Sequence, residues 1–159
     1  MRMRQAGLAC AALAVAALAG AWQAAPALAQ AGAASGTAGD VVAERKAGLK
    51  QMAGHLEAIK GILDSRGALE PVAGRATEMQ RFFEGFPARF PPGSDTGDTR
   101  ALPAVWSDRA GFERASANMV AALGKLRDAA AAGDAGATAT AFREAGGTCG
   151  ACHRNYRAR

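Results

Sequence analysis

Cysteine and histidine are scarce in this chain, and their scarcity excludes several kinds of site. The 159 residues include three cysteines and two histidines. A structural zinc site needs four Cys or His ligands, and Cys10 and His55 lie far in the sequence from the other three. We therefore expect no zinc centre. Strand-like alternation of Val, Ile and Tyr is also missing, so thioredoxin-like redox chemistry has no βαβ context in which to occur.

The chain also lacks a long uninterrupted apolar segment and a strong excess of charge. The apolar run from Leu8 to Ala21 is short for a membrane span, and Gly20, Gln23 and Pro26 interrupt this part of the chain. The formal net charge of +5 is mild and scattered along the sequence, which does not indicate nucleic-acid binding. At most, this charge favours acidic protein partners.

The N-terminus has the layout of a secretory signal peptide. Arg2 and Arg4 form a short basic region, an apolar run follows, and Ala27-Leu28-Ala29 is a small-x-small cleavage site. We predict that residues 1–29 are a signal peptide that is removed and that residues 30–39 form a flexible leader. A membrane anchor and a lipoprotein are the disfavoured alternatives. A chain exported in this way would be periplasmic, with no membrane attachment after cleavage.

From residue 40 onward the apolar pattern predicts helices only, with Asp40 as the first N-cap. Four helices are expected, with a long loop rich in proline and glycine between the second and third; the helices span about 40–65, 71–84, 107–132 and 134–156, and the loop spans 85–102. Apolar residues in the first helix recur at spacings of three and four, which is typical of left-handed packing. We therefore predict an all-α protein in which residues 40–159 form an antiparallel left-handed four-helix bundle.

The end of the sequence contains the motif Cys149-Gly-Ala-Cys152-His153. Cys-x-x-Cys-His is typical of c-type haem attachment. Two thiols form thioethers with the vinyl groups of one porphyrin, and the imidazole binds its iron. On a helix these three side chains lie on one face. We predict one covalently bound haem c near the C-terminus; a disulfide between Cys149 and Cys152 is the alternative.

Three glycines in the same predicted helix require an explanation. Gly146, Gly147 and Gly150 lie beside the motif, and each costs up to about 1 kcal/mol of helix stability relative to alanine. Close approach of the porphyrin to the backbone is one explanation. A helix that bends or begins late is another.

These features together resemble cytochrome c′, a class II c-type cytochrome, over about residues 40–159. The matching elements, in chain order, are Arg45-Lys-Ala-Gly-Leu49, Thr96-Gly-Asp98 with Pro103-Ala-Val-Trp106-Ser107-Asp108, and Cys149 to Arg157. The resemblance implies that His153 is the proximal haem ligand and that Arg157 lies on the proximal side of the haem. It also implies that Arg45 approaches a haem propionate; otherwise Arg45 is a solvated helix charge.

The resemblance makes position 49 informative, because low-spin relatives have methionine there as the sixth iron ligand. Leu49 has no lone pair with which to coordinate iron, so we expect a vacant sixth site shielded by apolar side chains. Met52, one turn further along, is the alternative sixth ligand, which requires a shift of register. His55 is expected at the surface or in a cap.

The function that these observations favour is that of a periplasmic c-type haem protein with five-coordinate high-spin iron. Such a protein transfers single electrons to and from periplasmic redox partners and binds small gases, nitric oxide and carbon monoxide. A low-spin electron carrier with a Met sixth ligand, similar to cytochrome c-556, is the alternative. A peroxidase-like enzyme is disfavoured because no histidine is placed as a distal acid or base. A haem-free helical binding module with a disulfide is a further alternative. Members of the family are often antiparallel dimers, so the resemblance implies a homodimer as one assembly.

Overall fold

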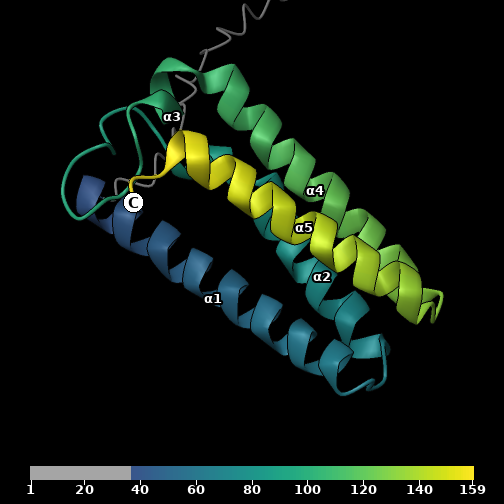
Figure 1. Ribbon diagram of the computed structural model, residues 1–159. Helices are drawn as coiled ribbons and strands as arrows, with labels where there is room; N and C mark the ends of the chain where they lie inside the picture. The colour runs from purple at the N-terminus through teal and green to yellow at the C-terminus, as the bar shows by residue number, and fades with distance from the viewer. Residues whose placement is uncertain (1–36) are drawn as a thin grey trace, which may run out of the picture. The chain divides into compact units, whose positions relative to one another are not determined.

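The computed structural model describes residues 37–159, which form a bundle of four long helices (Figure 1). The elements in chain order are α1 (Ala38–Asp64), α2 (Glu70–Glu84), the 3₁₀ turn η1 (Pro87–Arg89), the short α3 (Ala104–Ser107), α4 (Arg109–Ala131) and α5 (Ala135–Tyr156). The predicted all-α antiparallel four-helix bundle is confirmed. The predicted signal peptide, residues 1–29, and the leader as far as residue 36 lie outside the described residues. None of the helices between residues 37 and 159 is long and apolar enough to cross a membrane.

The helix α1 begins earlier than the sequence predicts. Its N-cap is Thr37, and Asp40 lies in the first turn. The backbone N–H of Thr37 donates to Asp40 Oδ2 at 2.8 Å, and the backbone N–H of Asp40 donates to Thr37 Oγ1 at 3.3 Å. This reciprocal capping box satisfies two backbone donors, whereas Asp40 acting alone as the N-cap would satisfy one. Residues 37–39, which the sequence predicts as part of the leader, therefore belong to the cap and first turn of α1.

The third predicted helix is divided at Asp108. The chain leaves helical geometry there, with φ of −113° and ψ of 56°, and the Asp108 carboxylate accepts the backbone N–H of Gly111. Asp108 is thus the N-cap of α4, and the short helix α3 precedes it. The start of α5 agrees with the prediction, since Gly133 has φ of 71° and Asp134 caps the helix by accepting the N–H of Ala137 at 2.8 Å.

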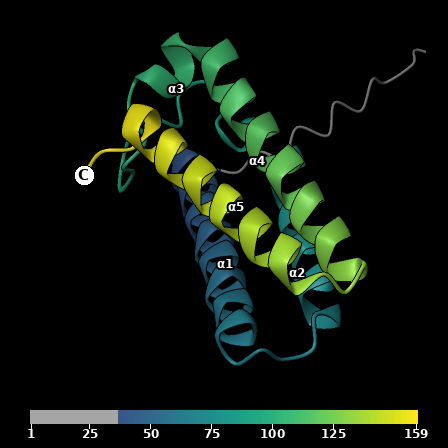
Figure 2. The same cartoon turned by 45° about the vertical axis from the view of Figure 1, so that its right-hand side comes forward.

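The four helices pack unequally. α4 packs against both α2 and α5, whereas α1 packs mainly against α2, as Figures 1 and 2 show from two sides. The main core has apolar side chains from all four helices, including Met52, Ile59, Met79, Met119 and Leu123. This core keeps α2, α4 and α5 together as one unit and attaches α1 along one side of it.

Gly48 allows the close approach of α1 to α2. A Cβ at this position would lie 2.3 Å from Cε2 of Phe82 and 2.9 Å from its Cζ. The Phe82 ring is held in place by Phe83 and Phe86, with ring centroids 5.2 and 5.5 Å away. The ring cannot move aside without disturbing these neighbours, so residue 48 must lack a side chain for α1 to pack as it does.

His55 also lies in the contact between α1 and α2, and the prediction that it is at the surface or in a cap is wrong. The side chain is buried, with Nε2 3.2 Å from Oε2 of Glu78 and Nδ1 3.3 Å from Nη1 of Arg75. The prediction did not include the packing of α2 against this side of α1.

An aromatic cluster closes the end of the bundle where the long loop crosses. Phe90 and Phe112 pack edge to face with centroids 4.9 Å apart, and Phe112 packs against Tyr156 in the same way at 5.3 Å. Edge-to-face pairs add to the stability that burial of these rings gives. The cluster therefore fixes the loop, the start of α4 and the end of α5 against one another.

Hydrogen bonds fix the last turn of α5 at the same place. Tyr156 Oη donates to Asp108 Oδ2 at 2.8 Å, and the carbonyl of Tyr156 accepts the N–H of Leu102 at 3.0 Å. An isolated antiparallel bridge follows between Ala101 and Arg157. A Cβ on Gly111 would lie 2.4 Å from Tyr156 Oη, so glycine is needed there for the tyrosine to reach Asp108.

We predict that Gly48→Ala destabilises the protein by about 1–3 kcal/mol, because the added methyl group overpacks the contact with Phe82. Gly54→Ala, in the same helix, is the matched control, since its Cβ would meet nothing within 4 Å. It should stabilise the helix by up to about 1 kcal/mol. Urea unfolding followed by circular dichroism measures both free energies. Equal effects of the two substitutions would contradict the packing described here.

We predict that Tyr156→Phe lowers the unfolding temperature most strongly between about pH 4 and about pH 10. The hydrogen bond from Tyr156 lowers the pKa of Asp108, so its stabilising effect is present above the pKa of an unfolded aspartate and is lost as the pH falls through the lower folded value. The same bond raises the pKa of Tyr156, so its effect is lost as the pH rises through the raised value. Thermal unfolding of both proteins across this range tests the prediction. A difference that does not change with pH would assign the effect to packing alone.

Candidate functional site

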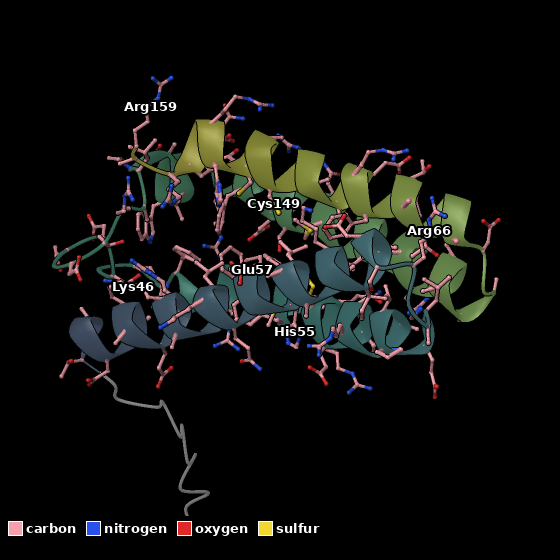
Figure 3. All side chains as sticks on the ribbon, turned by 60° about the horizontal axis from the view of Figure 1, so that its bottom comes forward. Lys46, His55, Glu57, Arg66, Cys149 and Arg159 are labelled. Carbon is pink, nitrogen blue, oxygen red and sulfur yellow. The ribbon has the colours of Figure 1, made fainter. Side chains whose placement is uncertain are left out.

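A cavity of about 550 Å³ lies between α1 and α5. Its volume is within the range of roughly 300–1,000 Å³ that is typical of small-molecule and cofactor sites. The inner wall is apolar and comes from α2, α4 and the aromatic cluster, with Met79, Phe83, Phe86, Phe112 and Met119. Figure 3 shows Cys149 on α5 pointing toward the space that separates this helix from α1. The cavity is the place in the described chain where chemically distinctive side chains converge.

The α5 wall holds Cys149, Cys152 and His153, all of which line the cavity. Their helical spacing places them on one face, as the sequence predicts. Both cysteines are half-buried free thiols, so the described chain has no disulfide between them. Burial raises the pKa of both thiols, and the nearby Cys149 raises that of Cys152 further. The two sulfurs are therefore uncharged at neutral pH.

His153 presents an imidazole at the same wall. Partial desolvation lowers its pKa, and the positive charge of Arg157, one turn further along, lowers it further. A lower pKa favours the neutral imidazole, which is the form that binds metals. Arg157 also lines the cavity and is exposed. The structure thus brings His153 and Arg157 to the same side of the cavity, as the resemblance implies.

The glycines of α5 do not have the explanation that the sequence suggests. The helix is continuous from Ala135 to Tyr156, so it does not begin late. Gly146, Gly147 and Gly150 are not among the residues that line the cavity, so the structure gives no support for close approach of a bound group to them. Added Cβ atoms at Gly146 and Gly147 would meet nothing within 4 Å, and nothing in the structure explains glycine at these two positions.

Leu49 and Met52 line the cavity from α1. Leu49 is 36% exposed, whereas Met52 is 5% exposed and packs in the main core. Leu49 therefore borders the cavity near its opening, and Met52 lies deeper. The two side chains that the sequence singles out as candidates for the sixth position both reach the cavity.

Arg45 is a buried cation at the edge of the cavity. It is 2% exposed, so the alternative of a solvated helix charge is wrong. Its guanidinium donates to Ser94 Oγ at 3.0 Å, to the Ser94 carbonyl at 2.8 Å and to Thr99 Oγ1 at 2.6 Å. It also lies 4.5 Å from the centre of the Phe90 ring. Local spacing does not reveal these loop partners, because Ser94 is 49 positions away from Arg45.

The charge of Arg45 has no carboxylate partner among residues 37–159, since its hydrogen bonds end on neutral oxygens. Burial lowers its pKa, yet a guanidinium stays protonated in proteins. A buried cation is costly unless an anion compensates it. The cavity therefore offers two thiols and an imidazole on one wall, a buried cation that suits a carboxylate, and an apolar interior. This set fits a haem group, which is largely apolar, has two propionates and accepts an imidazole at its iron.

Comparison with known proteins places this site in a family. The family model described as Cytochrome C' matches residues 40–157. Cytochrome c-556 from Agrobacterium tumefaciens (strain II Chrys) is 36% identical over 120 residues, which is 73% of this chain and 95% of that protein. Cytochrome c' from Rubrivivax gelatinosus is 32% identical over 122 residues, 75% of this chain and 95% of that protein.

A solved structure extends the similarity to the arrangement of the helices. It is a nitric oxide complex of a mutant of cytochrome c prime from Alcaligenes xylosoxidans, with a TM-score of 0.70 and 27% identity, covering 77% of this chain and 97% of that one. The helical bundle agrees with these matches. The chain therefore belongs to the cytochrome c′ family, whose members have covalently attached haem c.

Proposed function

We propose that this protein is a periplasmic haem protein with five-coordinate high-spin iron, which exchanges single electrons and binds small gases, nitric oxide and carbon monoxide. One observation supports this proposal above all: Leu49, which cannot coordinate a metal, lines the same cavity as His153 from a different helix. Because the leucine side chain has no lone pair, the sixth coordination position of the iron would stay vacant. A gas can then bind the iron at that position.

The chain's own residues have distinct roles in this proposal. Cys149 and Cys152 would hold the haem through thioethers, and the imidazole of His153 would bind its iron. Arg45 pairs with a haem propionate, which gives its buried charge the partner that the described chain does not supply. Arg157 lies beside His153 and favours the neutral imidazole. The haem supplies one-electron redox chemistry and an iron site for ligands.

The apolar inner wall of the cavity suits a neutral gas, and the described side chains offer little support for an enzymatic reaction. Asp98 is the carboxylate among the described residues that line the cavity, and it is paired with Lys46. The Tyr156 hydroxyl donates to Asp108. No described carboxylate lines the cavity unpaired, and His153 lies on the opposite wall from Leu49, so neither is placed beside Leu49 as the acid or base that cleavage of an O–O bond would require. A related protein from Alcaligenes xylosoxidans has been solved as a nitric oxide complex, which supports the assignment of a gas ligand. The protein is accordingly proposed to be an electron-transfer and gas-binding protein, not an enzyme.

The alternative is a low-spin electron carrier in which Met52 is the sixth ligand. Met52 lines the cavity one turn beyond Leu49, and a relative at 36% identity is a cytochrome c-556. Ligation by Met52 would require this side chain to leave its place in the core, where it is 5% exposed. This requirement is the reason for preferring the five-coordinate form.

The proposed location in the periplasm depends on the N-terminal segment, which lies outside the described residues. Arg2, Arg4 and Ala27-Leu28-Ala29 indicate a signal peptide at residues 1–29. Removal of this segment takes away Cys10 and leaves Cys149 and Cys152 as the cysteines of the mature chain. Such a chain has no spare thiol, which suits haem attachment after export.

We predict that the mature protein lacks residues 1–29 and has one haem bound through Cys149 and Cys152. One intact-mass measurement on protein expressed with its N-terminus and with haem-maturation enzymes reports both changes. The haem should stay with the polypeptide in acid–acetone, because thioether bonds resist extraction. The double variant Cys149→Ser with Cys152→Ser should show the cleaved polypeptide mass alone. A wild-type mass equal to the polypeptide without haem would refute the proposed function.

We predict that the ferrous protein has a high-spin spectrum and that Leu49→Met shifts it partly or wholly to low spin, since a thioether binds haem iron. Met52→Leu is the matched control and should leave the wild-type spectrum unchanged. Each exchange should cost less than about 1.5 kcal/mol in stability, because leucine and methionine have similar volumes. Leu49→Ala should open the cavity and speed the binding of carbon monoxide. A low-spin wild type that Met52→Leu converts to high spin would establish the alternative instead.

A further inference from the structure

Positive side chains surround the opening of the haem cavity. Five cations line it, and among the described residues a single carboxylate, Asp98, does so; the cations are Arg45, Lys46, Lys50, Arg100 and Arg157. Arg45 is buried, and the other four are exposed. We refer to Lys46, Lys50, Arg100 and Arg157 as the cationic rim. This local excess differs from the rest of the molecule, where charges of both signs are mixed.

The rim charges are mostly uncompensated. Asp98 pairs with Lys46, whereas Lys50, Arg100 and Arg157 form no ion pair within residues 37–159. Away from the cavity, Lys and Arg side chains form ion pairs with Asp64, Glu113, Glu144 and Asp128. Asp98 and two haem propionates would offset three of the five cavity cations, so the rim stays positive when haem is bound.

The rim is built on a fixed frame. Lys46 and Lys50 are one helical turn apart on α1, so both lie on the same face. Arg100 and Arg157 lie on two chain segments joined by the hydrogen bond from the N–H of Ala158 to the Arg100 carbonyl at 2.8 Å and by the bridge from Ala101 to Arg157. Figure 3 shows Lys46 at the same end of the bundle as the C-terminal Arg159. Three separate segments thus present their charges around one opening.

We propose, on the basis of the proposed haem function, that the cationic rim is the docking surface for an acidic electron-transfer protein. The carboxylates of the acidic protein pair with Lys50, Arg100 and Arg157. The electron passes through the opening that these three side chains surround. Exposed charges of one sign attract an oppositely charged partner and speed the encounter by about 10- to 1,000-fold at low ionic strength. The contact would consist of exposed ion pairs between the rim and the acidic protein. Such contacts are typical of small transient interfaces that form and separate rapidly. An acidic protein is favoured over a single small anion because the charges are spread over three chain segments.

Stopped-flow oxidation of the reduced holoprotein tests this surface. One electron passes from the reduced protein to ferricyanide, which becomes ferrocyanide. Poly-L-glutamate added to the reaction represents an acidic protein surface and competes for the rim. The variants are Lys50→Glu and Arg100→Glu, each at an exposed position outside the haem ligands. Arg143→Glu is the matched control, because it makes the same charge change on α5 at an exposed residue that does not line the cavity.

Each rim variant should slow oxidation by ferricyanide about tenfold at low ionic strength, and the rates should converge with wild type in high salt. Poly-L-glutamate should slow the wild type and Arg143→Glu but not the rim variants. Tris(phenanthroline)cobalt(III), a cationic oxidant, should react faster with the rim variants than with wild type. An unchanged Soret spectrum in each variant shows that the haem site is intact.

Two results would overturn the proposal. If Arg143→Glu slows oxidation as much as Lys50→Glu, net charge and not the rim controls the encounter. If poly-L-glutamate does not compete but vesicles of phosphatidylglycerol do, the rim faces a membrane and not a protein. A protein without covalent haem would fail the mass measurement before any kinetic test, so failure of the haem function is distinguishable from failure of this surface.

Discussion

The hydrogen bond between Tyr156 and Asp108 is the contact on which the geometry of the candidate site depends. It ties the last turn of α5 to the first turn of α4, and Cys152 and His153 lie on the turn just before it. Gly111 leaves room for this contact, and the Leu102 N–H binds the carbonyl of the same tyrosine. Because the end of the helix is held on two sides, the chain fixes the backbone position from which the imidazole projects. A side chain whose backbone is held in this way loses less conformational freedom when it binds a ligand.

The α1 wall of the cavity is held by contacts with α2 and with the loop. α1 packs against α2 at Gly48, and His55 lies between Arg75 and Glu78 at the same contact. Near the start of α1, Arg45 donates hydrogen bonds to Ser94 and Thr99 in the loop. The loop is in turn fixed by the aromatic cluster. The position of Leu49 over the cavity therefore depends on contacts that lie on both sides of it along α1.

The parts of the site that the sequence predicts are those that follow from local spacing. Cys149, Cys152 and His153 share a face because the helical repeat requires it, and Asp134 after Gly133 marks the start of their helix. The parts that it does not predict depend on long-range contacts. The carboxylate of Asp108 accepts a hydrogen bond from Tyr156, which is 48 positions away, and the burial of His55 depends on which side of α1 is covered by α2. Arg45 has neutral partners 49 and 54 positions away, and no pattern in the sequence brings these residues together.

The unequal packing of the four helices has a consequence for maturation. α4 packs closely against both α2 and α5, whereas α1 joins their common core along one side and forms one wall of the cavity. Haem must reach two thiols that are half-buried once α1 is in place. A chain in which α2, α4 and α5 have assembled but α1 has not docked would display both thiols and the imidazole on an open face. If the first helix in the sequence docked last, its docking would close the cavity behind the attached cofactor.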